Sequence, residues 1–230
     1  MHRKNVKTQP LQLSLYASGV STGKLYLLNE FLKKGKVLDI GCGNGLYGLH
    51  LASQGYELLQ IDLVDRRDER ARHLPFRKMD AQCLDFADNE FDHVIAFDIM
   101  EHLDDDTKFL QDMRRICKQQ IFISVPNSDD ERIANLGLTH IHHKDKTHRR
   151  EYSREQLKTL LEENNFKILC VRPNIATGLP FFAHALAKNN PVAKWAARLI
   201  TLECRALIRF GLFENCTVGD WYCVGEKVSG

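Results

Sequence analysis

Three glycines at alternate positions follow an apolar run with one aspartate, and together they indicate a ligand-binding turn. The segment reads Val37-Leu38-Asp39-Ile40-Gly41-Cys42-Gly43-Asn44-Gly45. A turn that lacks every second side chain lets a bound molecule lie directly against the main chain. The spacing differs from the G-x-G-x-x-G pattern that holds a pyrophosphate at a helix N-terminus. Because Asp39 would repel a phosphate and attract an amino group, we expect a cationic ligand without phosphate.

A second acid follows the next apolar run, at a position suited to a sugar. Asp62 lies 21 residues after Gly41, at the end of an expected strand over residues 57–61. A carboxylate there can accept hydrogen bonds from both hydroxyls of a ribose, as the acid of nucleotide-binding folds does. Asp65 is the weaker candidate for this role. The alternative for Asp62 is an exposed loop acid without a ligand.

Strands and helices alternate along the chain, which predicts an α/β fold with a doubly wound parallel sheet. The expected strands cover residues 36–40, 57–61, 76–79, 93–97, 121–125, 167–171 and 221–226, and the expected helices 25–32, 47–54, 107–117 and 154–164. Open sheets of this kind bind ligands outside the carboxyl ends of their strands, where the glycine turn and Asp62 lie. We expect a single domain over residues 1–230, with an irregular lead-in over residues 1–23.

The glycine segment resembles motif I of the class I S-adenosylmethionine (SAM) methyltransferases, which bind a cationic cofactor without phosphate. Residues 80–94 and 97–103 are also similar to the family's pattern, and the second segment contains its Glu-His pair. The resemblance covers residues 36 to about 171 and the closing strand, and points to the type-11 and ubiquinone-biosynthesis O-methyltransferases. It implies seven strands in the order 3-2-1-4-5-7-6, with strand 7 antiparallel.

The resemblance also implies the cofactor and the residues that bind it. SAM would be the methyl donor, and S-adenosylhomocysteine the product. Asp39 is suited to the ammonium group of SAM, Asp80 to the adenine amino group, and Asp98 lies nearest the sulfonium. The implied cofactor-binding residues are Asp39, Gly41, Cys42, Gly43, Gly45, Asp62, Leu63, Asp80, Ala81, Gln82, Phe97 and Asp98.

Histidines are concentrated in residues 140–148, after the fifth strand. In ubiquinone-biosynthesis-type O-methyltransferases, a histidine-containing segment at this place reaches over the substrate. Imidazole, with a reference pKa of about 6.5, can accept a hydroxyl proton near neutral pH. We select His148 as the general base, then His143, with His102 as a further catalytic candidate. The alternatives are a solvated basic loop with incidental histidines, and a His102 that caps or packs under the sheet.

No metal site is predicted from the histidine-rich segment. His140, His142, His143 and Asp145 are close in sequence. Closed zinc sites use four ordered ligands, often with cysteine, and magnesium sites use oxygen ligands. Neither pattern is met.

An insert over residues 172–220 separates the last two strands, which the resembled family joins by a short connection. Four basic residues fall within about 60° of one another on a helix with 100° per residue. They are Lys194, Arg198, Arg205 and Arg209, and the neighbouring face carries Trp195, Leu199, Leu202, Ala206 and Phe210. This helix either packs its apolar side on the sheet, or forms a lid or a membrane-surface contact through residues 173–215.

Composition narrows the class of protein. The 230 residues carry a net charge of only +2, so we expect no nucleic-acid partner. The seven cysteines are never spaced C-x-x-C, which indicates reduced thiols. No apolar run reaches the roughly 20 residues that span a bilayer. We expect a cytoplasmic protein, with a peripheral location at the inner membrane surface as the alternative, and the sequence does not determine the oligomeric state.

The sequence thus predicts a SAM-dependent methyltransferase that acts on a small-molecule acceptor. The expected acceptor atom is a hydroxyl oxygen of a saccharide, a quinone-like compound or a lipid-linked compound. Two alternatives stay open. One is a SAM-binding protein that holds a partner without methyl transfer, and the other is a protein or RNA methyltransferase.

Overall fold

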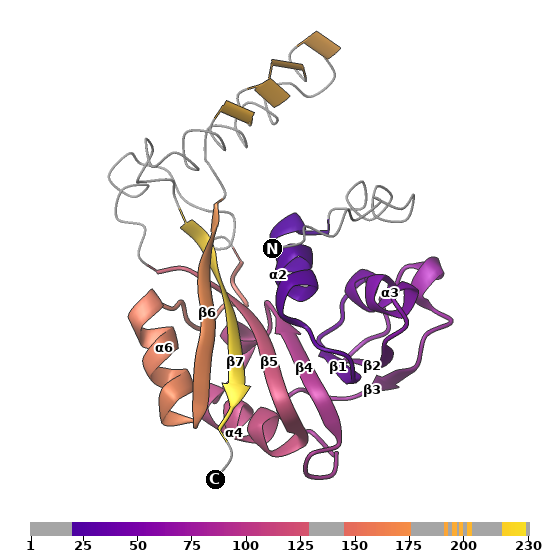
Figure 1. Ribbon diagram of the computed structural model, residues 1–230, viewed down its shortest axis with the longest axis vertical. Coiled ribbons are helices and arrows are strands. Elements are labelled where there is room, and N and C mark those ends of the chain that lie inside the picture. Colours follow the sequence, from indigo (N-terminus) through magenta and orange to yellow (C-terminus); the bar gives the residue numbers. More distant parts are fainter. Residues whose placement is uncertain are drawn as a thin grey trace, which may run out of the picture.

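The computed structural model describes residues 20–128, 145–175 and 218–228, with short helical pieces between residues 191 and 203. Within these residues lies a seven-stranded sheet of order β3-β2-β1-β4-β5-β7-β6 (Figure 1). The strands are β1 (Lys36–Ile40), β2 (Glu57–Asp62), β3 (Phe76–Lys78), β4 (Phe91–Phe97), β5 (Cys117–Pro126), β6 (Phe166–Ile175) and β7 (Val218–Lys227). The pairs are parallel except that β7 is antiparallel to β5 and β6. The predicted fold class and strand order are confirmed.

The strand order reverses at β1, which lies between β2 and β4. Leu38 pairs with Leu59 on one side and with Val94 on the other. A reversal of this kind opens a crevice at the carboxyl ends of the strands, where ligands bind in open α/β sheets. The glycine turn leaves β1 at this edge.

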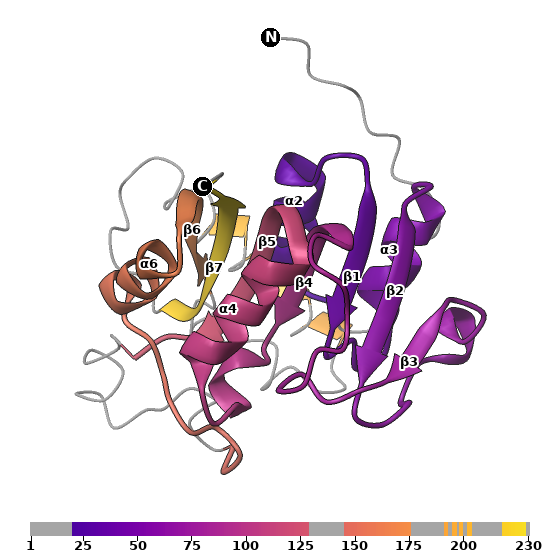
Figure 2. The ribbon, with the colours of Figure 1, turned by 90° about the horizontal axis from the view of Figure 1, so that it is seen from below.

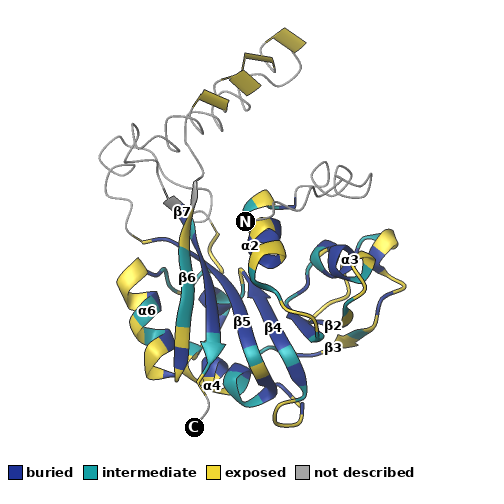
Figure 3. Ribbon diagram, viewed as in Figure 1, coloured by how far each residue is buried: buried dark blue, intermediate teal, exposed yellow. Residues whose placement is uncertain are grey.

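Helices cover both faces of the sheet (Figure 2). The helices are α2 (Thr22–Phe31), α3 (Leu46–Ser53), α4 (Asp106–Ile116) and α6 (Arg154–Glu163), and the single 3₁₀ turns are η1 (Glu69–Ala71) and η2 (Met100–His102). One cluster of buried apolar side chains joins the sheet to α4 and α6, and a second joins it to α2 and α3. The central strands are buried between these layers (Figure 3). The sheet is therefore a rigid support for the loops at its edge.

Several boundaries of helices and strands differ from the prediction. Helix α2 begins at Thr22 because the side-chain oxygen of Ser21 accepts a hydrogen bond of 3.5 Å from the N–H of Lys24. Thr22 and the residue after it are thus helical, which corrects the predicted lead-in over 1–23; residues 1–19 lie outside the described residues. Strands β6 and β7 are longer than predicted, because their pairing continues to Ile175 and Val218. They occupy the two ends of the predicted 172–220 insert.

The insert contains a helix in its described part. Residues 191–192, 195–196, 198–199 and 202–203 are helical, and Figure 1 shows them beyond the upper ends of β6 and β7. Four apolar side chains on these helical residues are exposed: Val192, Trp195, Leu199 and Leu202. Their exposure argues against the expectation that the apolar side packs on the sheet. No helix among the described residues is long and apolar enough to cross a membrane.

Candidate cofactor and active site

The glycine turn joins β1 to α3 through a backbone that favours glycine at each alternate position. The φ angles of Gly41, Gly43 and Gly45 are +65°, +52° and +72°, in the region that side chains disfavour. The N–H of Cys42 donates to the carbonyl of Ile61 at 3.0 Å, and the N–H of Gly45 closes the turn on the carbonyl of Cys42 at 2.8 Å. The turn is thereby attached to the end of β2.

Two of these glycines have different surroundings. At Gly41 an added Cβ would collide with the side chain of Ile99, which follows β4. At Gly43 an added Cβ would meet no atom within 4 Å. The turn therefore packs closely on the segment after β4 at one residue and presents a bare main chain to open space at the other. A ligand can contact this bare main chain.

Asp39 is buried beneath the turn and is held by a residue that the sequence analysis missed. Its Oδ2 accepts a hydrogen bond of 3.0 Å from Nε2 of Gln60, which also donates to the carbonyl of Gly45 at 3.2 Å. Burial raises the pKa of Asp39 to about 7, and the hydrogen bond from Gln60 opposes this rise. A polar residue between Leu59 and Ile61 was the available signal for Gln60. Asp39 can therefore ionise near neutral pH when a cationic ligand binds.

Asp62 lies at the carboxyl end of β2 with its carboxylate against the glycine turn. Its Oδ2 accepts a hydrogen bond of 2.9 Å from the N–H of Gly43, and its Oδ1 one of 3.3 Å from the N–H of Val64. Each oxygen can accept a further hydrogen bond from a ligand. The carboxylate of Asp65 is instead bound by the guanidinium of Arg67 through two hydrogen bonds of 2.9 Å. Asp62 is thus better placed than Asp65 to bind ribose hydroxyls.

The residues predicted on the adenine side lie in the loops after β2 and β3. Leu63 is 57% exposed, and Asp80 is exposed with Oδ1 accepting a hydrogen bond of 2.9 Å from the N–H of Gln82. Ala81 and Gln82 are half-buried. The side-chain oxygen of Gln82 accepts a hydrogen bond of 3.1 Å from the N–H of Asp104. The adenine side is therefore tied to the segment that follows η2.

Asp98 follows β4 in an unusual backbone conformation and forms an ion pair that the sequence analysis did not predict. Its φ is +55°, a value that is rare outside glycine and marks local strain. Lys24 of α2 is buried and pairs with Oδ2 of Asp98, and the hydroxyl of Ser124 donates to Oδ1 at 2.5 Å. Lys24 is 74 residues away in the sequence, so no local pattern indicates the pair. The charge of Asp98 is therefore partly compensated.

Cys42 and Phe97 are buried and present no reactive group. The ring of Phe97 is buried edge to face against Tyr47, with 5.2 Å between the ring centroids. Cys42 is buried, and this burial raises the pKa of its thiol far above the usual range. Their contribution to cofactor binding is thus confined to packing and main-chain contacts.

Two predicted catalytic histidines come together beside a buried glutamate. The rings of His102 and His148 lie edge to face with centroids 4.6 Å apart. One nitrogen from each ring and one carboxylate oxygen of Glu101 all lie within 4.8 Å of one another. Glu101 is 1% exposed. His143 lies outside the described residues. We call Glu101, His102 and His148 the Glu-His cluster.

The surroundings of Glu101 and His148 favour the uncharged forms of these two side chains. Burial raises the pKa of Glu101 to about 8, and the charge of Asp98 adds to this rise. Burial lowers the pKa of His148, and the charge of a protonated His102 lowers it further. Asp145 opposes this lowering, because its Oδ2 lies 3.8 Å from Nε2 of His148. A cation at the cluster would favour the ionised form of Glu101.

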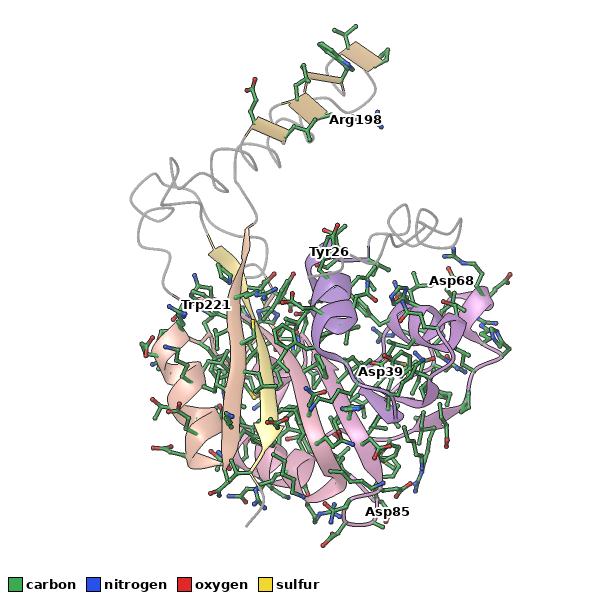
Figure 4. The ribbon with its side chains drawn as sticks, in the orientation of Figure 1. Tyr26, Asp39, Asp68, Asp85, Arg198 and Trp221 are labelled. Atoms are coloured by element: carbon green, nitrogen blue, oxygen red, sulfur yellow. The ribbon has the colours of Figure 1, made fainter. Side chains whose placement is uncertain are left out.

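The carboxylates and the open main chain of the site suit SAM. Gly43 presents an open main chain, Asp62 can accept hydrogen bonds from ribose, and Asp39 and Asp98 supply carboxylates for a cationic molecule. These residues follow or end neighbouring strands at the reversal of strand order. Figure 4 shows Asp39 within the sheet, whereas the labelled Asp85 lies on the outer edge of the molecule.

Comparisons with known proteins agree with this geometry. The model of a family described as "Methyltransferase domain" matches residues 16–171. The ubiquinone biosynthesis O-methyltransferase of Azorhizobium caulinodans is 33% identical over 88 residues, which are 35% of this chain and 35% of that protein. The chloroplastic tocopherol O-methyltransferase of Arabidopsis thaliana is 31% identical over 125 residues, 50% of this chain and 34% of that protein. These matches span about a third of the relatives' length.

Solved structures share the fold over most of the chain. A SAM-dependent methyltransferase from Archaeoglobus fulgidus has a TM-score of 0.60 and 21% identity, covering 95% of this chain and 100% of that one. At this identity, the likeness establishes the fold and leaves the acceptor open.

We expect Gly43→Ala to abolish SAM binding while the protein stays folded, because the new methyl group would occupy the open space at the turn. Gly55→Ala is the matched control, since Gly55 also has a positive φ, +78°, and nothing within 4 Å of an added Cβ. Each variant should lose about 1 kcal/mol of unfolding free energy in urea for its backbone strain. Calorimetry should show lost SAM binding for Gly43→Ala alone. Equal SAM affinities would contradict this placement of the cofactor.

SAM affinity should rise with pH, because the ionised carboxylate of Asp39 attracts the ammonium group of SAM. The pKa of Asp39, about 7, places this rise in affinity near neutral pH. Below that pKa, SAM affinity should increase by up to about tenfold per pH unit. Calorimetry should measure SAM affinity between about pH 5.5 and 7.5. This range lies below the ordinary α-amino pKa of about 7.7–8.0, so the ammonium group of SAM stays charged.

Asp39→Asn is the control for this pH dependence, since it keeps an oxygen for Gln60 but cannot ionise. Its SAM affinity should be weaker and flat with pH. The raised pKa also means that the ligand-free protein loses stability as pH rises from about 4 to about 7, and Asp39→Asn should remove this loss. A flat SAM affinity in the unaltered protein would contradict the role of Asp39.

Proposed function

The chain belongs to the methyltransferase-domain family, and from this premise we propose that it methylates a hydroxyl of a small apolar molecule. The observation that carries the proposal is the Glu-His cluster, formed around η2 directly after β4. SAM, the cofactor, supplies a methyl group on a positively charged sulfur that is already a good leaving group. The protein must then position the acceptor and provide a route for its proton.

The proposed cofactor site uses the ends of β1, β2 and β4. Asp62 would accept hydrogen bonds from the ribose, and the ionised Asp39 would attract the ammonium group. Lys24 and Ser124 hold the carboxylate of Asp98 in place. In this proposal Asp98 would lie near the reactive end of the cofactor, with its negative charge partly compensated by Lys24.

The Glu-His cluster supports a hydroxyl acceptor, because a hydroxyl loses its proton as the methyl group arrives. His102 and His148 lie within reach of one another and border the segment that carries Asp98. Neutral imidazoles bind protons or other cations readily. The selection of His148 as the residue that removes the proton stays a prediction.

Two observations favour an apolar acceptor over a saccharide. The insert helix exposes Val192, Trp195, Leu199 and Leu202, and an apolar surface of this kind suits an apolar ligand or a membrane. The names of two curated relatives refer to ubiquinone biosynthesis and to tocopherol. We therefore place quinone-like and lipid-linked hydroxyl compounds first.

Incubation with methyl-labelled SAM tests the activity directly. The acceptors to compare are a catechol, a hydroquinone, a lipid extract, a free saccharide, a primary amine and RNA. We expect label on a hydroxyl compound of the first three, with S-adenosylhomocysteine formed in equal amount and a product heavier by one methyl group. Label confined to the amine or RNA would contradict the proposal, and so would SAM binding without transfer to any acceptor.

His148→Ala should lower kcat by at least about 100-fold, in the range of a lost proton-transfer group. SAM affinity should change by less than about twofold, because His148 lies outside the proposed cofactor contacts at the ends of β1, β2 and β4. His73→Ala is the control, since His73 is exposed and lies outside the cluster. Full turnover by His148→Ala would remove His148 from the mechanism.

We also propose that the exposed face of the insert helix contacts a membrane surface. The sequence of residues 191–210 contains four basic residues and a single acidic residue, Glu203. The basic residues are Lys194, Arg198, Arg205 and Arg209. Basic residues beside an apolar face attract anionic headgroups while the apolar side chains enter the interface. The proposed location of the protein is therefore peripheral to such a membrane.

Liposome flotation tests this contact. Trp195→Ser with Leu202→Ser should reduce flotation with anionic vesicles, because the two largest exposed apolar groups of the face are removed. Val228→Ser should float like the unaltered protein, since Val228 is an exposed apolar residue at the opposite end of β7. Equal flotation of all three proteins, or none by the unaltered protein, would end the proposal.

A further inference from the structure

We propose that Lys24 is a positioning residue that pairs with Asp98 and so prevents its carboxylate from acting on the sulfonium of SAM as a free anion. Lys24 belongs to α2, whereas Asp98 follows β4. Through this ion pair, Lys24 would set the ratio of the affinities for SAM and for S-adenosylhomocysteine and keep the methyl group reactive. This role rests on the proposed placement of Asp98 near the reactive end of the cofactor.

Lys24 is a buried cation that the structure places on Asp98. Lys24 is 5% exposed, and its Nζ pairs with Oδ2 of Asp98. The same Nζ lies over the rings of Phe97 and Tyr222, 5.3 and 5.8 Å from their centroids. Aromatic rings attract a cation with their faces but carry no net charge. Because a buried ammonium group requires a counter-charge, the carboxylate of Asp98 stabilises Lys24 in its charged form.

The amino end of α2 is attached to the rest of the molecule, which fixes the position of Lys24. Oγ of Ser21 lies 2.9 Å from the hydroxyl oxygen of Tyr222, and the N–H of Ser21 donates to the hydroxyl of Tyr47 at 3.2 Å. At Gly23 an added Cβ would lie 2.6 Å from the ring of Tyr222. The helix therefore packs directly on β7, and Lys24 is held beside the carboxyl end of β4.

Within the ion pair, Asp98 is the residue that a ligand can approach. Its Oδ1 accepts a hydrogen bond of 2.5 Å from the hydroxyl of Ser124, and its Oδ2 is bound by Lys24. The side chain of Asp98 is nonetheless 52% exposed, whereas Lys24 is buried. The next residue, Ile99, packs on Gly41 of the glycine turn. A cofactor on the turn can therefore meet the carboxylate while the ammonium group of Lys24 stays covered.

SAM and S-adenosylhomocysteine differ by one charge at the sulfur atom. SAM has a positive sulfonium there, and transfer of the methyl group leaves the sulfur uncharged. An unpaired Asp98 would favour the charged form, because opposite charges attract strongly in a poorly solvated site. Stabilising the sulfonium more than the transition state, in which its charge is dispersed, would slow transfer. Lys24 limits this stabilisation and leaves Asp98 in place.

The ratio of the Kd for S-adenosylhomocysteine to the Kd for SAM, measured by calorimetry, tests this role without any acceptor. Both ligands share the ammonium group, the ribose and the adenine, so effects on these contacts cancel in the ratio. Lys24→Met keeps a long side chain against Phe97 and Tyr222 but has no charge. We expect this variant to raise the ratio by at least about fivefold, because Asp98 becomes an uncompensated anion.

Asp98→Asn should lower the same ratio, because the charge of Lys24 then repels the sulfonium. The double variant, Lys24→Met with Asp98→Asn, has no charge at the pair, and its ratio should return to within about twofold of the unaltered value. A merely structural role of Lys24 would weaken both ligands together and leave the ratio unchanged. Opposite shifts in the two single variants therefore separate electrostatics from damage to the fold.

Two control variants remove the same charges far from the site. Lys33 pairs with Glu226 at 3.2 Å, and Asp85 pairs with Arg77 at 2.9 Å, in exposed ion pairs. Lys33→Met and Asp85→Asn should both keep the ratio of the unaltered protein. A shift in either control as large as that in Lys24→Met would show an effect of net charge and overturn the role of Lys24.

An unchanged ratio in Lys24→Met would also overturn this role, and so would shifts in the same direction in Lys24→Met and Asp98→Asn. With a methylated acceptor in hand, Lys24→Met should lower kcat by about fivefold or more without raising the KM for SAM. If the ratios shift as expected but no acceptor is methylated, the proposed function fails and the role of Lys24 in cofactor binding remains. If a hydroxyl compound is methylated and the ratios do not shift, the proposed function stands and the role of Lys24 fails.

Discussion

Between β1 and α3 the chain must leave a buried strand, begin a helix and still keep its main chain uncovered. A backbone with positive φ at three alternate glycines meets this demand, because bare Cα atoms occupy the positions where side chains would stand. The side-chain amide of Gln60, in β2, donates hydrogen bonds to Asp39 and to the carbonyl of Gly45, and these bonds attach the turn to β2. The side chain of Ile99 fills the space that a side chain at Gly41 would occupy. The same turn therefore also positions the segment after β4. The crevice for the cofactor and the Glu-His cluster depend on these contacts.

Carboxylates gather around this turn, and each is stabilised in a different way. Asp39 is held by an amide, Asp62 by main-chain N–H groups, and Asp98 by the buried Lys24. The buried carboxylate of Glu101 has an oxygen without a hydrogen-bond partner in the described part of the chain. The negative charge of Asp62 adds to the raised pKa of Asp39, and that of Asp98 adds to the raised pKa of Glu101. This charge pattern suits a cofactor with an ammonium and a sulfonium.

The family match covers the part of the chain that contains the proposed cofactor site. The family match ends at residue 171, before the insert between β6 and β7. Both ends of the insert join strands at the carboxyl edge of the parallel sheet, because β6 enters it and the antiparallel β7 leaves it. Segments at this edge face the ligand in open α/β sheets. Recognition of the acceptor is therefore expected in a part of the chain where relatives offer little guidance.

Local patterns in the sequence were enough to predict the alternation of strands and helices, the glycine turn and the acids at strand ends, because neighbouring residues produce these features. The strand order followed from the family that these motifs resemble, and the structure confirmed it. Only the tertiary structure brought Lys24 to Asp98, and Glu101 to His148, because these contacts join elements far apart in the chain. Lys24 had no sequence signal beyond a single basic residue between the expected lead-in and the first expected helix, whereas Asp98, the Glu-His pair and His148 were already selected from the sequence. Burial then favoured the uncharged forms of Glu101 and His148, which no local pattern indicates.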